Sequence, residues 1–155
     1  MKQPLEGRNL ANESPNVGPY VVGHQFAKNY QFTPDLVREF SRLAGDTNQL
    51  HHDELVASSS RFGQLIASGT HSSAILFGLT AEHYSQYGSV VGLHFDITFS
   101  QAVPATALAR LEWTVTTVTP TGRNSAQVLD LVGRLTLEDG TVCVRSNGRL
   151  LVGFQ

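Results

Sequence analysis

The sequence predicts an α+β domain in which helices come first and an antiparallel set of strands follows. Between residues 34 and 82, apolar residues recur at the spacing of helices, whereas from Val91 onward apolar and polar residues alternate as they do in strands. In addition, the pair Asp139-Gly140 is typical of a tight hairpin between consecutive strands. The expected architecture is therefore a long apolar helix with an antiparallel meander around it.

A strand and a helix open the expected domain. Residues 20–32 can form a strand. Thr33 can cap free backbone N–H groups of the helix that follows, and Pro34 suits the first helical position. Gly45 can end this helix by adopting a positive φ. The apolar face of the helix is formed by Val37, Phe40, Leu43 and Ala44.

Two more helices are expected in the first half of the chain. Asp53 can cap a short helix that runs to about Ser60. Residues 61–69 then lead to a third helix from about Thr70 to Glu82. This third helix is apolar on most sides, so we expect it to be buried at the centre of the domain.

Four strands are expected after the third helix. Pro104 breaks the alternation that begins at Val91, the segment Pro120-Thr121-Gly122 is typical of a turn, and Asp139-Gly140 marks the final hairpin. The strands are predicted at residues 91–99, 107–118, 126–137 and 141–152.

The length of 155 residues is sufficient for one domain with a substantial core. Residues 1–19 are polar and carry Pro, Asn and Gly, which predicts a flexible N-terminal arm followed by a single domain over residues 20–155. Charged residues make up only 15% of the chain, below the usual quarter. This low proportion indicates either a large self-association surface or a long apolar tunnel.

Composition also disfavours several classes of function. The formal net charge is −2 and no block of Lys and Arg occurs, so nucleic acid is not an expected partner. No stretch approaches the roughly 20 apolar residues needed to span a bilayer, and the N-terminus has no signal-peptide core. Cys143 is the single cysteine and cannot form an internal disulfide. These features predict a cytoplasmic protein with an inert buried thiol.

One loop carries more polar chemistry than folding requires. Residues 45–53, Gly-Asp-Thr-Asn-Gln-Leu-His-His-Asp, bring carboxylates, imidazoles and a carboxamide together between two helices. A carboxylate and an imidazole, here Asp46 and His51, can share a water and move protons near neutral pH. Asp46 and Asn48 are also common in turns, where they bond to nearby backbone, so a purely structural role stays open. No metal site is expected, because the ligands are too close in sequence to wrap one ion.

A second feature lies at the start of the third helix, in the segment Ala67-Ser68-Gly69-Thr70. Free N–H groups at a helix start favour negative charge, and Gly69 lets a substrate approach the backbone closely. Such a site can stabilise an enolate oxygen. The alternative is a plain Ser/Thr cap with a glycine that allows tight packing.

Together, these segments resemble the hydratase signature of the MaoC-like proteins and the (R)-specific enoyl-CoA hydratases. That signature has Gly-Asp, any residue, Asn-Pro, any residue, His, any residue and Asp, and this chain matches it at Gly45, Asp46, Asn48, His51 and Asp53. Arg61-Phe62-Gly63 and the segment from Ile66 to Gly69 resemble the family's entry into its central helix. The resemblance covers roughly residues 32–108.

The resemblance implies a hot-dog fold, in which an antiparallel sheet wraps around a long central helix, and a homodimer. It implies that Asp46 and His51 activate water, that the backbone N–H of Gly69 polarises the thioester carbonyl, and that Asn48 orients the loop. The expected reaction is the reversible hydration of a trans-2-enoyl thioester of coenzyme A or acyl carrier protein to the (R)-3-hydroxyacyl thioester. No metal or redox cofactor is implied.

The chain departs from the family pattern near the site. Gln49 replaces the usual proline, and Ser68 replaces the histidine that commonly precedes the helix glycine. Thr70 and His71 replace a more apolar pair, and with Ser68 they are candidate substrate contacts. Two alternative functions stay open: a thioesterase of the same fold, and a non-catalytic module that binds acyl thioesters.

Overall fold

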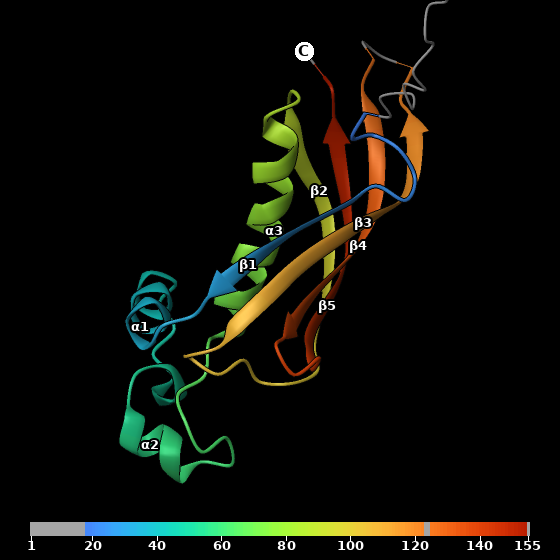
Figure 1. Ribbon diagram of the computed structural model, residues 1–155. Helices are drawn as coiled ribbons and strands as arrows, with labels where there is room; N and C mark the ends of the chain where they lie inside the picture. The colour runs from blue at the N-terminus through green and yellow to red at the C-terminus, as the bar shows by residue number, and fades with distance from the viewer. Residues whose placement is uncertain (1–17, 123–124, 155) are drawn as a thin grey trace, which may run out of the picture.

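The computed structural model describes residues 18–122 and 125–154, so the predicted flexible arm lies almost entirely outside the described residues. A strand comes first, helices follow, and four strands complete the chain (Figure 1), which confirms the predicted α+β order. The helices are α1 (Pro34–Leu43), the 3₁₀ turn η1 (Gln49–His51), α2 (Glu54–Ser59) and α3 (Gly69–Ser85). The strands are β1 (Gln25–Gln31), β2 (Val90–Phe99), β3 (Leu108–Pro120), β4 (Gln127–Leu137) and β5 (Val142–Val152).

The five strands form one antiparallel sheet in the order β1-β3-β4-β5-β2. Helix α3 lies along one face of this sheet, and α1 and α2 lie beyond the N-terminal end of α3 (Figure 1). A long helix against a single antiparallel sheet is the arrangement expected above. The sheet leaves β1 and β2 at its two edges, and β2 is the edge strand on the far side from β1.

The helix boundaries follow from their caps. The Thr33 side chain accepts a hydrogen bond from the backbone of Leu36 at 3.2 Å, and Gly45 follows α1 with φ of +73°. The prediction for β1 was too long, because residues 20–24 form a turn in which Gly23 has φ of +86°. Helix α3 extends beyond the predicted 70–82 range at both ends.

The Trp113 indole joins the sheet to α3. Its Nε1–H donates a hydrogen bond to the Leu76 carbonyl at 2.8 Å, and the whole side chain is buried. Gly133 lies beneath the indole on β4, where a Cβ atom would stand 2.6 Å from the ring. This contact fixes the middle of α3 against the sheet.

The expectation that α3 is buried on most sides is wrong for this chain taken alone. One face of the helix is buried against the sheet, while Ala74, Gly78 and Ala81 on the opposite face are exposed. On the neighbouring edge strand β2, Val91 and Leu93 are also exposed. Leu93 stands at an irregularity in the β2–β5 register, so the strict alternation predicted for this strand is interrupted. In the described part of the chain, no helix is long and apolar enough to cross a membrane.

Candidate active site

The polar loop after α1 is folded by its own side chains. The Asp46 carboxylate accepts a hydrogen bond from the backbone of Asn48 at 3.0 Å, and the Asn48 side chain accepts one from the backbone of Leu50 at 3.1 Å. The second bond caps the 3₁₀ turn η1, which returns the chain toward Asp46. The His52 ring donates to the Asp46 carbonyl at 2.6 Å and closes the loop. The structural and catalytic interpretations of Asp46 are therefore compatible, since one oxygen holds the loop and the other remains free of it.

Asp46 and His51 meet in the structure as expected. The distance between His51 Nε2 and Asp46 Oδ2 is 3.5 Å, and the His51 ring is almost fully buried, whereas the Asp46 side chain keeps about a third of its surface exposed. The other ring nitrogen, Nδ1, lies 2.8 Å from the Ile66 carbonyl. Because a carbonyl can only accept, Nδ1 carries the hydrogen, so in the neutral ring Nε2 presents its lone pair toward Asp46.

The start of α3 lies beside this pair. Ser68 is the N-cap, and its hydroxyl accepts a hydrogen bond from the backbone of His71 at 3.2 Å and contacts the Thr70 hydroxyl at 3.0 Å. Among the described residues, no hydrogen bond uses the backbone N–H of Gly69 or Thr70. These two N–H groups at a helix N-terminus can donate to a developing negative charge.

Two open pockets meet at this helix start. One, of about 650 Å³, is lined by His51, Arg61 and the segment 99–103. The other, of about 630 Å³, is lined by Asp46 and by apolar residues of α3 and β2. Asp46 and His51 thus line different pockets, and these two pockets share Gly69 and Phe99 as lining residues.

His71, a candidate substrate contact, lies away from both pockets. Its ring stacks on Phe40 with centroids 4.5 Å apart, and Nε2 lies 3.0 Å from the Tyr30 hydroxyl. Nδ1 is buried with no hydrogen-bond partner among the described residues. Burial lowers the pKa of His71, which favours the neutral ring. The structure therefore places His71 in the core between α1, α3 and β1.

The remaining candidates divide between lining and support. Gly69 lines both pockets and Thr70 lines the one that contains Asp46. Asn48 and Ser68 line neither, and both act on the backbone instead. The sequence did not indicate three contributions: the Ile66 carbonyl as partner of His51, the His52 ring as a donor within the loop, and Phe99 as a lining residue. Ile66 and Phe99 belong to segments distant from the motif.

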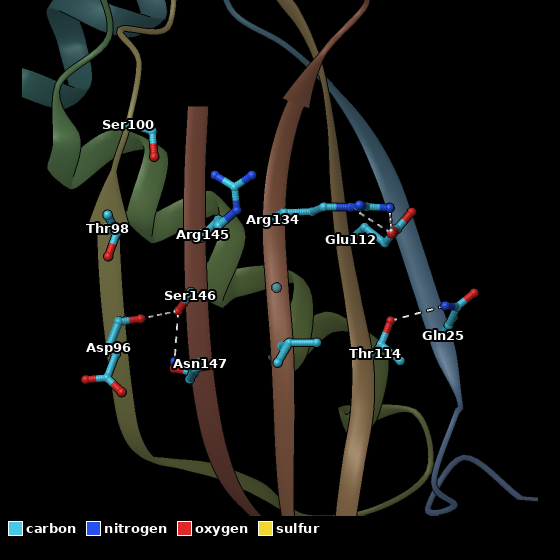
Figure 2. A pocket seen from close by; sticks show the side chains of 12 residues that line it. Gln25, Asp96, Thr98, Ser100, Glu112, Thr114, Arg134, Arg145, Ser146 and Asn147 are labelled. Carbon is cyan, nitrogen blue, oxygen red and sulfur yellow. Dashed lines mark hydrogen bonds and ion pairs between the residues drawn. The ribbon is translucent and has the colours of Figure 1, made fainter. Parts of the chain in front are cut away.

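A further pocket, of about 740 Å³, lies elsewhere, on the outer face of the sheet away from α3 (Figure 2). Its polar groups largely engage one another: Glu112 accepts from Arg134 at 2.6 Å and lies 3.3 Å from Arg110. Burial acts to raise the pKa of Glu112, but the hydrogen bonds and charges of these two arginines outweigh it and lower the pKa. No residue of the hydratase-like motif lines this pocket.

Comparison with solved structures identifies the architecture as the hot-dog fold. The chain is similar to the (R)-hydratase PhaJ1 of Pseudomonas aeruginosa, with a TM-score of 0.77 and 19% identity over 87% of this chain and 83% of that chain. It is similar to the (R)-hydratase of A. caviae involved in PHA biosynthesis, with a TM-score of 0.76 and 21% identity over 85% and 96%. The 3R-hydroxyacyl-ACP dehydratase complex HadBC of Mycobacterium tuberculosis has a TM-score of 0.70 and 16% identity over 84% and 96%.

The family follows from the sequence match. The MaoC like domain matches residues 22–131, which is most of the chain, so the protein belongs to the MaoC-like dehydratase family. A search of curated protein sequences finds no match. Family membership supports hydration or dehydration as the class of reaction.

Proposed function

We propose that this protein is a hydro-lyase that reversibly adds water to a trans-2-enoyl thioester and forms the (R)-3-hydroxyacyl thioester. The observation that carries the proposal is the Asp46–His51 pair, 3.5 Å apart and beside the free N–H groups of the α3 N-terminus. Reaction of an α,β-unsaturated thioester needs these two elements together: a proton-transfer pair, and donors for the oxygen on which charge develops. Neither a metal nor a redox cofactor takes part in the proposed reaction.

In the hydration direction, water gives one proton to the Asp46–His51 pair while its oxygen bonds to C3. The electron pair of the C2–C3 double bond moves to the thioester oxygen, and the enolate formed is stabilised by the N–H of Gly69. The pair then gives a proton to C2 and returns to its first state. His51 suits this role because the bond from Nδ1 to the Ile66 carbonyl leaves the Nε2 lone pair, on the side of Asp46, able to accept a proton from water.

The two pockets suggest how the substrate lies. The pocket with Asp46 is the more apolar one, lined by Ala74, Phe77 and Ile97, and is suited to an acyl chain. The pocket with His51 includes the cation Arg61, which complements the phosphates of coenzyme A or of the acyl-carrier arm. We therefore assign the acyl chain to the first pocket and the carrier arm to the second.

A homodimer is part of the proposal. Edge strand β2 presents unpaired backbone groups together with exposed Val91 and Leu93, and the adjacent face of α3 presents small residues. A second copy seated here would also close the open side of the apolar pocket, whose walls are α3 and β2. The low proportion of charged residues agrees with such an interface. We place the dimer in the cytoplasm, where the buried thiol of Cys143 stays reduced.

The test uses crotonyl-CoA and a medium-chain 2-enoyl-CoA with the purified protein. Loss of the enoyl-thioester absorbance without release of free thiol, and formation of the (R)-3-hydroxyacyl product on a chiral column, would support the hydratase. Release of coenzyme A would instead indicate the thioesterase. Tight binding of the thioester without any turnover, whether the carrier is coenzyme A or acyl carrier protein, would refute the enzyme and favour the binding module.

A further inference from the structure

Phe99 stands where the two pockets meet. It is the last residue of β2, and with Gly69 it is one of the two residues that line both the pocket of Asp46 and the pocket of His51. A Cβ atom built on Gly69 would lie 3.0 Å from the tip of the Phe99 ring, with two further ring carbons at 3.3 and 3.4 Å. The ring therefore occupies the space that a side chain at the first residue of α3 would need.

The backbone that carries this ring is held in place by the sheet, and the ring projects from it beside Gly69. Phe99 pairs with Val144 of β5, and the next two amides, of Ser100 and Gln101, donate to the Cys143 carbonyl at 2.8 and 3.3 Å. The Phe99 side chain is about half exposed, with a relative accessible surface of 52%.

The position of the ring determines which substrate atoms it meets. In the proposed reaction the thioester oxygen lies against the Gly69 N–H, so the atoms bonded to the thioester carbon lie nearest to Gly69 as well. Those atoms are C2 of the acyl chain and the sulfur of the carrier. A flat, unbranched enoyl thioester can lie against the face of an aromatic ring, whereas a substituent on C2 adds volume at the point that the ring occupies.

We propose that Phe99 is the residue that determines specificity at C2, by separating the acyl pocket from the carrier pocket and excluding acyl groups branched at that carbon. This inference rests on the proposed function, because it takes the thioester oxygen to lie at Gly69. It assigns substrates with an unbranched C2 to the wild-type protein. A single methyl group in an apolar site changes specificity by about tenfold or more, which is the size of effect expected here.

The experiment compares crotonyl-CoA with its 2-methyl analogue, tiglyl-CoA, by kcat/KM for the wild type and for Phe99→Ala. The wild type should prefer crotonyl-CoA, and Phe99→Ala should reduce that preference at least tenfold, chiefly by raising kcat/KM for tiglyl-CoA. Phe99→Leu should give an intermediate ratio, and it also tests the proposal if the alanine variant does not fold. Tyr87→Ala is the matched control, since Tyr87 is an aromatic residue of similar exposure at 50% that lines neither pocket, and its ratio should equal that of the wild type.

A binding measurement separates this inference from the proposed function. Dissociation constants are measured by calorimetry for butyryl-CoA and 2-methylbutyryl-CoA, which have no double bond to hydrate. If the wild type turns over neither enoyl thioester but binds the unbranched ligand better, and Phe99→Ala removes that difference, the hydratase is refuted and the role of Phe99 stands. If the wild type hydrates crotonyl-CoA and Phe99→Ala keeps the wild-type ratio, the hydratase stands and the role of Phe99 is refuted. Absence of both turnover and binding refutes both.

Discussion

Replacing Asp46 with Asn changes the acid–base pair while the loop keeps its shape. The amide retains one oxygen that can accept from the backbone of Asn48, as the carboxylate does at 3.0 Å. The amide nitrogen then takes the place of the oxygen 3.5 Å from His51 Nε2. Because an amide nitrogen donates and the Nε2 lone pair accepts, the two side chains would bond to each other and leave no base for water.

The size of the expected effect follows from this geometry. General acid–base catalysis by one positioned group contributes about 10² to 10⁴ in rate, so kcat should fall by that factor, or about 3 to 5 kcal/mol in activation free energy. The free energy of unfolding should change by no more than about 0.5 kcal/mol, because the Asp46 side chain is partly exposed and its loop bond persists. The melting temperature should accordingly shift by no more than about 2 °C.

The assay is the loss of enoyl-thioester absorbance with crotonyl-CoA, next to a thermal melt of the same preparation. Asp53→Asn is the matched control, since Asp53 carries the same group in the same loop but caps α2 through the backbone of Leu55 and Val56. Asn caps a helix about as well as Asp, so this variant should keep wild-type stability and turnover. A kcat for Asp46→Asn within tenfold of the wild type, with the melt unchanged, would refute the role assigned to the pair.

Three further outcomes are expected. Trp113→Phe should lower the free energy of unfolding by about 2 to 3 kcal/mol in urea titration, since it removes the buried bond to Leu76 and leaves a void; an unchanged midpoint would contradict the role of the indole. The pKa of His71 is lowered in the folded state, so the unfolded chain binds more protons and stability falls as the pH drops below about 6.5, by at most about 1.4 kcal/mol per pH unit for one such group. His71→Leu should therefore flatten the plot of melting temperature against pH between 7 and 5.5. A plot as steep as that of the wild type would contradict the contribution of His71 to the pH dependence. Leu93→Glu on the exposed edge strand should convert a dimer to a monomer in sedimentation, whereas a wild type that is already monomeric would contradict the proposed interface.

Local signals in the sequence predicted local structure well. Thr33, Asp53 and Gly45 act as the caps and stop that their types indicate, because a cap depends on atoms within three or four residues. The alternation of apolar and polar residues likewise located the four later strands to within about one or two residues of their bounds. The prediction of strand for residues 20–24 was wrong because the positive φ of Gly23 interrupts the extended backbone. A single glycine in an apolar run does not indicate that conformation in the sequence.

The shape of the polar loop after α1 was predictable for the same reason, but the more distant group that bonds to its histidine was not. Asp46, Asn48 and His51 lie within six positions, so their convergence needs only the 3₁₀ turn that Asn48 caps. The tautomer of His51, in contrast, depends on the Ile66 carbonyl, which is 15 positions away and reaches the ring only because the segment before α3 returns past η1. A backbone carbonyl carries no sequence signal, so residue types alone could not assign it.

His71 was predicted to contact the substrate because it is close to Gly69 in sequence, but helix geometry directs its side chain elsewhere. Each residue of an α-helix turns the side-chain direction by about 100°, so two positions beyond Gly69 a side chain points about 200° away from it. His71 accordingly faces Phe40 and Tyr30 in the core, although it belongs to the same helical turn as the N–H groups at the site. Phe99 is the converse case, since 30 positions separate it from Gly69 and its ring nonetheless lies where a side chain of that residue would stand. The aromatic side chain next to the helix start is therefore supplied by the edge strand of the sheet, and the register of β2 on β5 places it there.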